Sequence, residues 1–283
     1  MISRTIATAV LLISVGAAQS LAQAAAATDP WKRVPAPSSC FVDDGYEAKL
    51  HQAREEIAAD MEKQSELNAS VKEKFDAMDM REKMSRMQAY MMKDPQAAMK
   101  MMQAQQADAA SMRSGITASA DDEKALRSEL ETHKANFNSA ADAVSRPFQA
   151  KRQELIKAKA KSTMEGASFA FASQADVDSY LALFAQENAA YEKMCEPFFG
   201  ANGTFPAWLN SYRTKVIEKQ IDGGVKQDAT IANQMVIMDT PTGGYRSTAP
   251  LKGVRDYMHE VIQVYGFRKH KAGDPRFEKE TKK

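Results

Sequence analysis

The amino-acid sequence predicts an all-α protein: a long antiparallel helical hairpin, coiled-coil-like, with a smaller compact C-terminal helical region. Three observations lead to this prediction. Between Asp43 and Asp94 the chain contains no proline and a single glycine, Gly45. Apolar residues there, and again after residue 120, recur every three or four positions, which is the spacing of a buried stripe on a helix. After Gly200 the chain becomes richer in glycine, proline and aromatic residues, which indicates a more compact arrangement.

Residues 1–24 have the pattern of a cleaved secretory signal peptide. Arg4 precedes an apolar run over 6–18, which is shorter than the roughly 20 residues that a membrane-spanning helix needs. A small-x-small motif at residues 22–24 then provides a signal-peptidase site. We therefore expect export to the periplasm. No later segment is apolar for long enough to span a bilayer, so we expect no transmembrane segment after signal cleavage.

The first long helix is predicted within 43–94, after a linker over 25–42. Its apolar stripe weakens near Gln64, and it consists of Tyr46, Leu50, Ala53, Ile57, Met61, Leu67, Val71, Phe75 and Met78. Asp94-Pro95 predicts a break and a new start, because aspartate caps helices well and proline is tolerated in the first turn. Gly115 is then expected to be the C-cap residue. Whether the chain folds back at Asp94-Pro95 stays open at this point.

The second arm of the hairpin is predicted to begin near Ser119, where Asp122 completes a capping box. Its heptad-like seam consists of Leu126, Leu130, His133, Phe137, Ala140, Val144, Phe148, Lys151, Leu155 and Ala158. Pro147 is expected to kink this helix. An interruption over 165–176 precedes a further helix that starts at Ser173 or Gln174 and ends before Pro197. The predicted hairpin region is therefore 43–195.

Residues 196–270 are predicted to form the compact helical region, followed by a basic tail over 271–283. We expect a helix from Thr204 to a stop at Gly223-Gly224, a segment over 226–239 that favours helix over strand, a loop over 240–250 and a last helix ending at Gly266. We interpret the aromatic residues of this region as its core rather than as a ligand pocket. They are Phe198, Phe199, Phe205, Trp208, Tyr212, Tyr245, Tyr257 and Tyr265.

The two cysteines, Cys40 and Cys195, are predicted to form a disulfide, because an even pair in an oxidising compartment is usually bridged. A hairpin turn at 116–119 would place them opposite each other at its base, since they lie equally far from that turn in sequence. Two free thiols and an intermolecular bridge remain the alternatives.

The charge balance bears on the class of partner. Without Arg4 the mature chain has 37 basic and 37 acidic residues. Nucleic-acid binding relies on phosphate neutralisation by lysine and arginine, so we expect protein partners or self-association and no nucleic acid. The basic tail is read as a solvated end, with weak electrostatic docking on an acidic partner or membrane face as the alternative.

The stretch from Met78 to Met102 carries nine methionines. Methionine fills adaptable apolar surfaces, and adjacent pairs such as Met91 and Met92 place it on more than one helix face, so some side chains should face water or a partner. The predicted partner-binding residues are Met80, Met84, Met87, Met91, Met92, Met99 and Met102. Thioethers also suit Cu(I) and Ag(I), so the alternative is a soft-metal site. Its ligands would be Met84, Met87, Met99 and Met102.

Motifs of known chemistry are missing from the sequence. It has no Walker phosphate loop, no G-x-S-x-G nucleophile elbow, no dinucleotide glycine fingerprint and no C-x-x-C pair. His259-Glu260 lacks the second histidine of a zinc protease helix, since position 263 is glutamine. We therefore predict no catalytic residues and no cofactor. The expected function is a non-enzymatic periplasmic scaffold, envelope-assembly or chaperone-like protein; an enzyme site within 196–270 ranks last.

Overall fold

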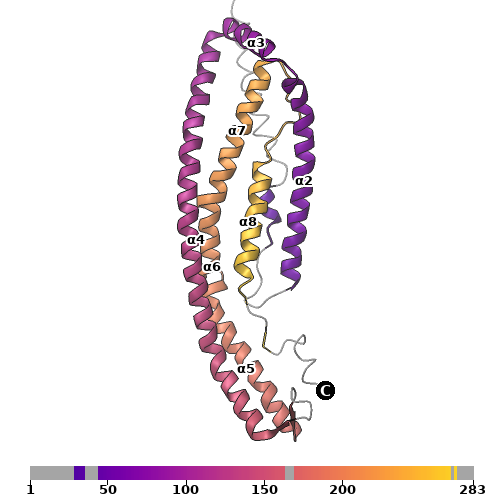
Figure 1. The fold of residues 1–283 in the computed structure, drawn as a ribbon, viewed down its shortest axis with the longest axis vertical. Coiled ribbons are helices and arrows are strands. Elements are labelled where there is room, and N and C mark those ends of the chain that lie inside the picture. The colour runs from indigo at the N-terminus through magenta and orange to yellow at the C-terminus, as the bar shows by residue number, and fades with distance from the viewer. Residues whose placement is uncertain (1–28, 36–43, 163–168, 269–270, 273–283) are drawn as a thin grey trace, which may run out of the picture. The chain divides into compact units, whose positions relative to one another are not determined.

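The computed structural model describes residues 29–35, 44–162, 169–268 and 271–272. The predicted signal peptide, Cys40 and nearly all of the basic tail lie outside these residues. The described elements are η2 (Pro30–Arg33), α2 (Asp44–Asp76), α3 (Met80–Lys93), α4 (Pro95–Lys159), β1 (Ala160–Ser162), β2 (Phe169–Phe171), α5 (Gln174–Phe199), α6 (Thr204–Tyr212), the π-helical η3 (Arg213–Ile217), α7 (Glu218–Ile237) and α8 (Ala249–Tyr265) (Figure 1). The predicted all-α class is confirmed.

The elements form two compact units, each assembled from three separate stretches of chain. The first unit holds the described residues of Met1–Ala36, Ala48–Asp121 and Thr214–His259. The second holds those of Pro37–Glu47, Asp122–Arg213 and Glu260–Lys283. Each unit therefore combines parts of the predicted hairpin region with parts of the predicted compact region.

In the first unit, polar side chains of α2 hold the loop between α7 and α8. Gln64 donates a hydrogen bond to the carbonyl of Gly244 at 2.9 Å. Asn68 donates to the carbonyl of Arg246 at 2.7 Å and accepts from its N–H at 3.0 Å. Gly244 has a φ of 90°, a conformation that favours glycine. The predicted weak point of the apolar stripe near Gln64 is thus where α2 binds this loop.

The core beside that loop joins α2 to α7. Met235 is fully buried with Ala232 and Tyr245, and Val71 and Phe75 of α2 pack against them. The Tyr245 hydroxyl donates to Asp228 at 3.3 Å, and burial together with this carboxylate raises the pKa of Tyr245 to about 12. The phenol therefore stays neutral, and able to donate this hydrogen bond, to a more alkaline pH than an exposed tyrosine does.

The predicted stop at Gly223-Gly224 is wrong, because α7 continues through both glycines. Packing gives the reason. A Cβ atom on Gly224 would lie 2.5 Å from the Cβ of Ala249 at the start of α8, and one on Gly253 would lie 2.5 Å from Cγ1 of Ile221 in α7. These glycines allow α7 and α8 to approach closely instead of ending a helix. The helix predicted over 226–239 and the loop that follows it are confirmed.

The predicted break at Asp94-Pro95 is confirmed, since α3 ends at Lys93 and α4 begins at Pro95. A second break, over 77–79, ends at Asp79, whose side chain caps α3 by accepting from the Glu82 N–H at 2.7 Å. The predicted turn at 116–119 is wrong. Helix α4 runs for 65 residues through it, and Gly115 lies inside this helix instead of ending one.

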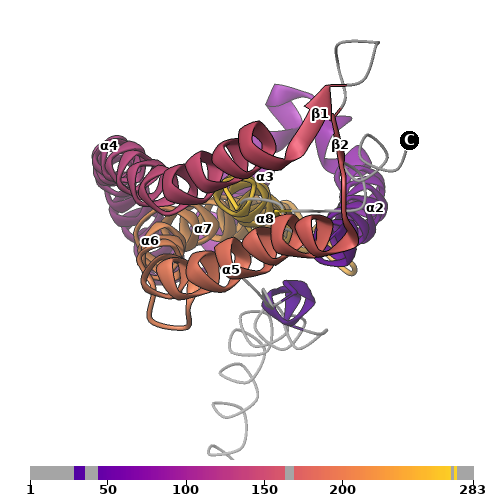
Figure 2. The ribbon, with the colours of Figure 1, turned by 90° about the horizontal axis from the view of Figure 1, so that it is seen from below.

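An antiparallel helical hairpin does occur in the second unit, with a different turn. The C-terminal part of α4 and α5 are joined by the antiparallel strands β1 and β2, which pair Ala160 with Phe171 and Ser162 with Phe169 (Figure 2). Ser173 caps α5 by accepting from the Asp176 N–H at 3.2 Å, which confirms the predicted start. The predicted end is wrong. Pro197 lies in the last turn, so the helix continues for two more residues to Phe199.

Aromatic rings fill the core of the second unit. Phe137 of α4 is fully buried, and its ring centroid lies 5.3 Å from those of Phe198 and Phe199 and 6.1 Å from that of Phe205. The Nε1–H of Trp208 donates to the carbonyl of Leu126 at 2.8 Å. Six of the eight aromatic residues that were predicted to form the core are buried, namely Phe199, Phe205, Trp208, Tyr212, Tyr245 and Tyr265. Phe198 and Tyr257 are only half-buried.

Cys195 is fully buried and is not a free thiol, whereas Cys40 lies outside the described residues. The predicted turn at 116–119, which would have placed the two cysteines opposite each other, is wrong. The Cys40–Cys195 bridge therefore stays a prediction. We expect peptide mapping of unreduced protein to give one cross-linked peptide pair containing both cysteines. The same map after reduction should show two alkylated peptides. Two alkylated cysteines in the unreduced sample would contradict the bridge.

Candidate functional site

Methionines of α3 and of the first turns of α4, in the first unit, make up seven of the eleven large apolar residues that are exposed among the described residues. All seven methionines predicted to bind a partner are exposed: Met80 73%, Met84 61%, Met87 38%, Met91 36%, Met92 84%, Met99 60% and Met102 48%. A group of large apolar side chains that are exposed close together in the sequence is typical of an interaction site rather than of an ordinary protein surface.

The seven side chains divide into two groups. Met80, Met84, Met92 and Met99 are each at least 60% exposed, and we call them the outer methionines. Met87, Met91 and Met102 line a pocket of about 50 Å³, and we call them the pocket methionines. The other residues that line this pocket are Tyr90, Ala98, Gln234 and Ile237. Helices α3, α4 and α7 thus each contribute to its wall.

Arg86 fixes α3 against the end of α7. Its Nη1 donates to the carbonyl of Met238 at 2.6 Å, while Nη2 and Nε donate to Glu82 at 2.9 and 3.2 Å. The Lys83 ammonium of α3 lies 4.6 Å from the ring centroid of Phe75 in α2. These contacts tie α3, which carries three of the residues that line the pocket, to α7 and α2.

The charges around the methionines are mainly positive. From Met80 to Met102 the chain has five basic residues and two acidic ones. One of the acids, Glu82, is already paired with Arg86. An apolar surface with a basic surround is complementary to a partner that offers apolar groups with acidic neighbours.

The alternative soft-metal set is brought together only in part. Met87 and Met102 share the pocket, but Met84 and Met99 do not line it, and Met91, which the alternative omitted, does. The residue numbers alone could not show this, because α3 and α4 are separate helices with different axes. Among the residues described, no group of three or more histidine, cysteine, aspartate or glutamate side chains could hold a metal ion.

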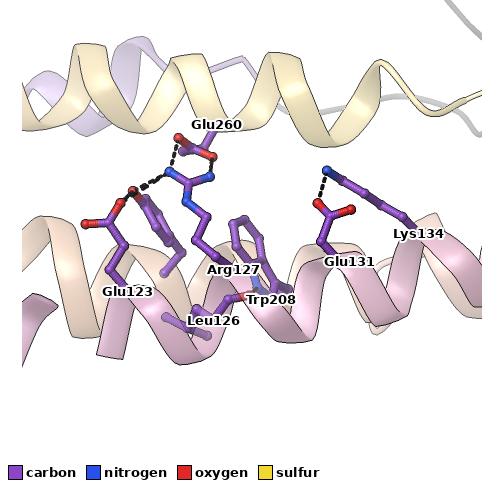
Figure 3. A network of polar contacts seen from close by, with 8 residues as sticks. Glu123, Leu126, Arg127, Glu131, Lys134, Trp208 and Glu260 are labelled. Atoms are coloured by element: carbon purple, nitrogen blue, oxygen red, sulfur yellow. Dashed lines mark hydrogen bonds and ion pairs between the residues drawn. The ribbon is translucent and has the colours of Figure 1, made fainter. Parts of the chain in front are cut away.

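A second cluster, in the second unit, is a polar network centred on Arg127 (Figure 3). Its guanidinium donates to both carboxylate oxygens of Glu260, at 2.5 and 2.6 Å, and to the Tyr212 hydroxyl at 3.1 Å. The Glu260 hydrogen bonds raise the pKa of Arg127 further, and burial raises the pKa of Tyr212 well above its usual value. Glu123 completes the network by accepting from the Tyr212 hydroxyl at 3.2 Å.

This network cross-links α4, α6 and α8, and its members satisfy one another, so we interpret it as structural. The sequence offered one local signal, the spacing of four between Glu123 and Arg127. In the sequence, Glu260 is notable only as the neighbour of His259. Its actual role is to hold Arg127, and that pairing joins residues 133 positions apart.

Comparison with protein-family models, curated proteins and solved structures gives no match to this chain. In the part of the chain that the structure describes, no helix is both long and apolar enough to cross a membrane.

Proposed function

We propose that the chain is a non-enzymatic helical interaction protein of the periplasm, and that it binds partner proteins with the methionines of α3 and of the start of α4. It would act as a scaffold, an envelope-assembly factor or a chaperone-like holder. The observation that carries this proposal is the exposure of the outer methionines, at least 60% each, on α3 and the start of α4.

Energetics support a binding role for this surface. Covering one exposed methionine contributes roughly 1.5–3 kcal/mol when burial is complete. Four such side chains therefore provide enough apolar contact for a protein partner. Methionine also adapts its shape to different surfaces, which suits a protein that holds more than one client.

The periplasmic location is proposed from the signal-peptide pattern of residues 1–24. A partner would then be another envelope protein, an exported client or a second copy of the chain. The basic residues among the methionines favour a partner with acidic side chains around its apolar contact.

The test is photo-cross-linking in cells from position 88. Gln88 is exposed in α3 and lies four residues from both Met84 and Met92, so a benzoylphenylalanine there shares their helix face. We expect adducts with the wild-type background and about tenfold fewer with M80Q/M84Q/M92Q/M99Q, because each replacement removes apolar contact. Circular dichroism should show unchanged helicity, since the replaced side chains face water.

The matched control replaces four exposed apolar residues elsewhere, in L67Q/L181Q/V225Q/V236Q; these side chains are 40–50% exposed. This control should keep the wild-type adducts. Adducts of twice the chain mass would identify a second copy as the partner. Equal adducts from the methionine variant and the wild type would refute the proposed function.

A further inference from the structure

Three thioether side chains line one pocket in the first unit. Met87 and Met91 lie four residues apart, on one face of α3, and Met102 comes from α4 beyond the break at Asp94-Pro95. They are 38%, 36% and 48% exposed, which makes them less exposed than the outer methionines. The fold therefore brings thioether side chains from two helices to one pocket.

The chemistry of the lining selects a class of ligand. Thioethers are soft, neutral donors that prefer Cu(I) and other soft cations to zinc, magnesium or calcium. No carboxylate lines the pocket, whereas the Tyr90 ring and the Gln234 amide do. An aromatic ring and an amide oxygen both tolerate a nearby positive charge. We propose that Met87, Met91 and Met102 bind a soft monovalent cation, Cu(I) or Ag(I), through their sulfur atoms.

The size and support of the pocket fit this ligand. A volume of about 50 Å³ exceeds the roughly 10–15 Å³ that one water molecule needs, so a single ion among three sulfurs has room. The hydrogen bond from Arg86 to the Met238 carbonyl holds α3 beside α7, where Gln234 and Ile237 complete the wall. Methionine side chains have three rotatable bonds, so the sulfurs can adjust to the ion.

The inference goes beyond the proposed function and does not depend on it. The pocket methionines and the outer methionines are different residues, so variants separate the two roles. A partner protein could instead insert an apolar side chain into the same pocket, and the experiment distinguishes that case.

The experiment titrates Ag(I) into the mature chain against a competing thioether chelator. Free thiols are first alkylated without reduction, so that cysteine does not contribute. We expect about one equivalent to bind more tightly than micromolar, and the ¹³C ε-methyl signals of Met87, Met91 and Met102 to shift together. M87L/M91L/M102L should weaken binding by about 100-fold or more, because the pocket then presents no sulfur. Leucine keeps the size and the helix propensity.

The matched control is M80L/M84L/M92L/M99L, which should bind Ag(I) as the wild type does. The single variant M102L, which leaves α3 unchanged, should already weaken binding and serves if the triple variant does not fold. Equal Ag(I) affinity of wild type and M102L, or no wild-type binding tighter than micromolar, would overturn the inference. A triple variant that loses cross-links but keeps Ag(I) affinity would assign the pocket to a partner side chain instead.

Discussion

Phe137→Ala is expected to lower the free energy of unfolding by about 3–5 kcal/mol, as large cavities left by buried phenylalanines do. Phe137 is 0% exposed, and its ring meets rings from α5 and α6 edge-on. Removing it leaves a cavity that cannot collapse easily, because the surrounding rings are held by one another. Phe199 and Phe205, for instance, have ring centroids 4.6 Å apart.

Guanidinium unfolding followed by Trp208 fluorescence measures this effect. The chain has two tryptophans, Trp31 in the first unit and Trp208 in the second, so a W31F background leaves the signal of the second unit alone. Leu181→Ala is the control, because Leu181 is 48% exposed in the same unit and should cost less than about 0.5 kcal/mol. If both variants unfold at the same denaturant concentration, Phe137 is not the centre of this core.

Glu187→Ala should cost a similar amount, about 3–5 kcal/mol, for an electrostatic reason. Glu187 of α5 accepts a hydrogen bond from Arg152 of α4 at 2.5 Å, and the two side chains are 8% and 12% exposed. The alanine variant leaves the guanidinium buried without its carboxylate. The Phe184 ring, 4.3 Å from the guanidinium, compensates only in part.

We expect two further variants to show that burial decides how much stability is lost when an ion pair is broken. Glu131 pairs with Lys134 at 2.6 Å, but its side chain is 72% exposed, so Glu131→Ala should cost less than about 1 kcal/mol. The double variant R152M/E187L should recover most of the loss, because an apolar pair needs no charge compensation. A double variant as unstable as Glu187→Ala would mean that packing, not the unpaired charge, causes the loss.

Local signals in the sequence predicted several elements well. The proline after Asp94 marked the start of α4, Ser173 marked the start of α5, and Gly266 marked the end of α8. Each of these signals acts through its own backbone neighbours. Glycine was a less reliable signal for the end of a helix. Gly115 and Gly224 both lie inside helices, and Gly224 is there because α8 leaves no space for a side chain.

For the candidate site, the sequence predicted the exposure of the methionines but not the pocket. Too many methionines for one helix face meant that some had to be exposed, and the exposed fractions agree with that expectation. The pocket was not predictable, because joining Met102 to Met87 and Met91 depends on how α3 is held. That depends in turn on the hydrogen bond from Arg86 to Met238, whose partners lie 152 positions apart.

The interleaving of the two units has a consequence for the history of the chain. Each unit draws on three stretches, and the stretches alternate along the sequence. Joining two ready-made domains end to end cannot produce such an order, and no single cut separates one unit from the other. A deletion that removes one unit and keeps the other must therefore remove three separate stretches of the chain.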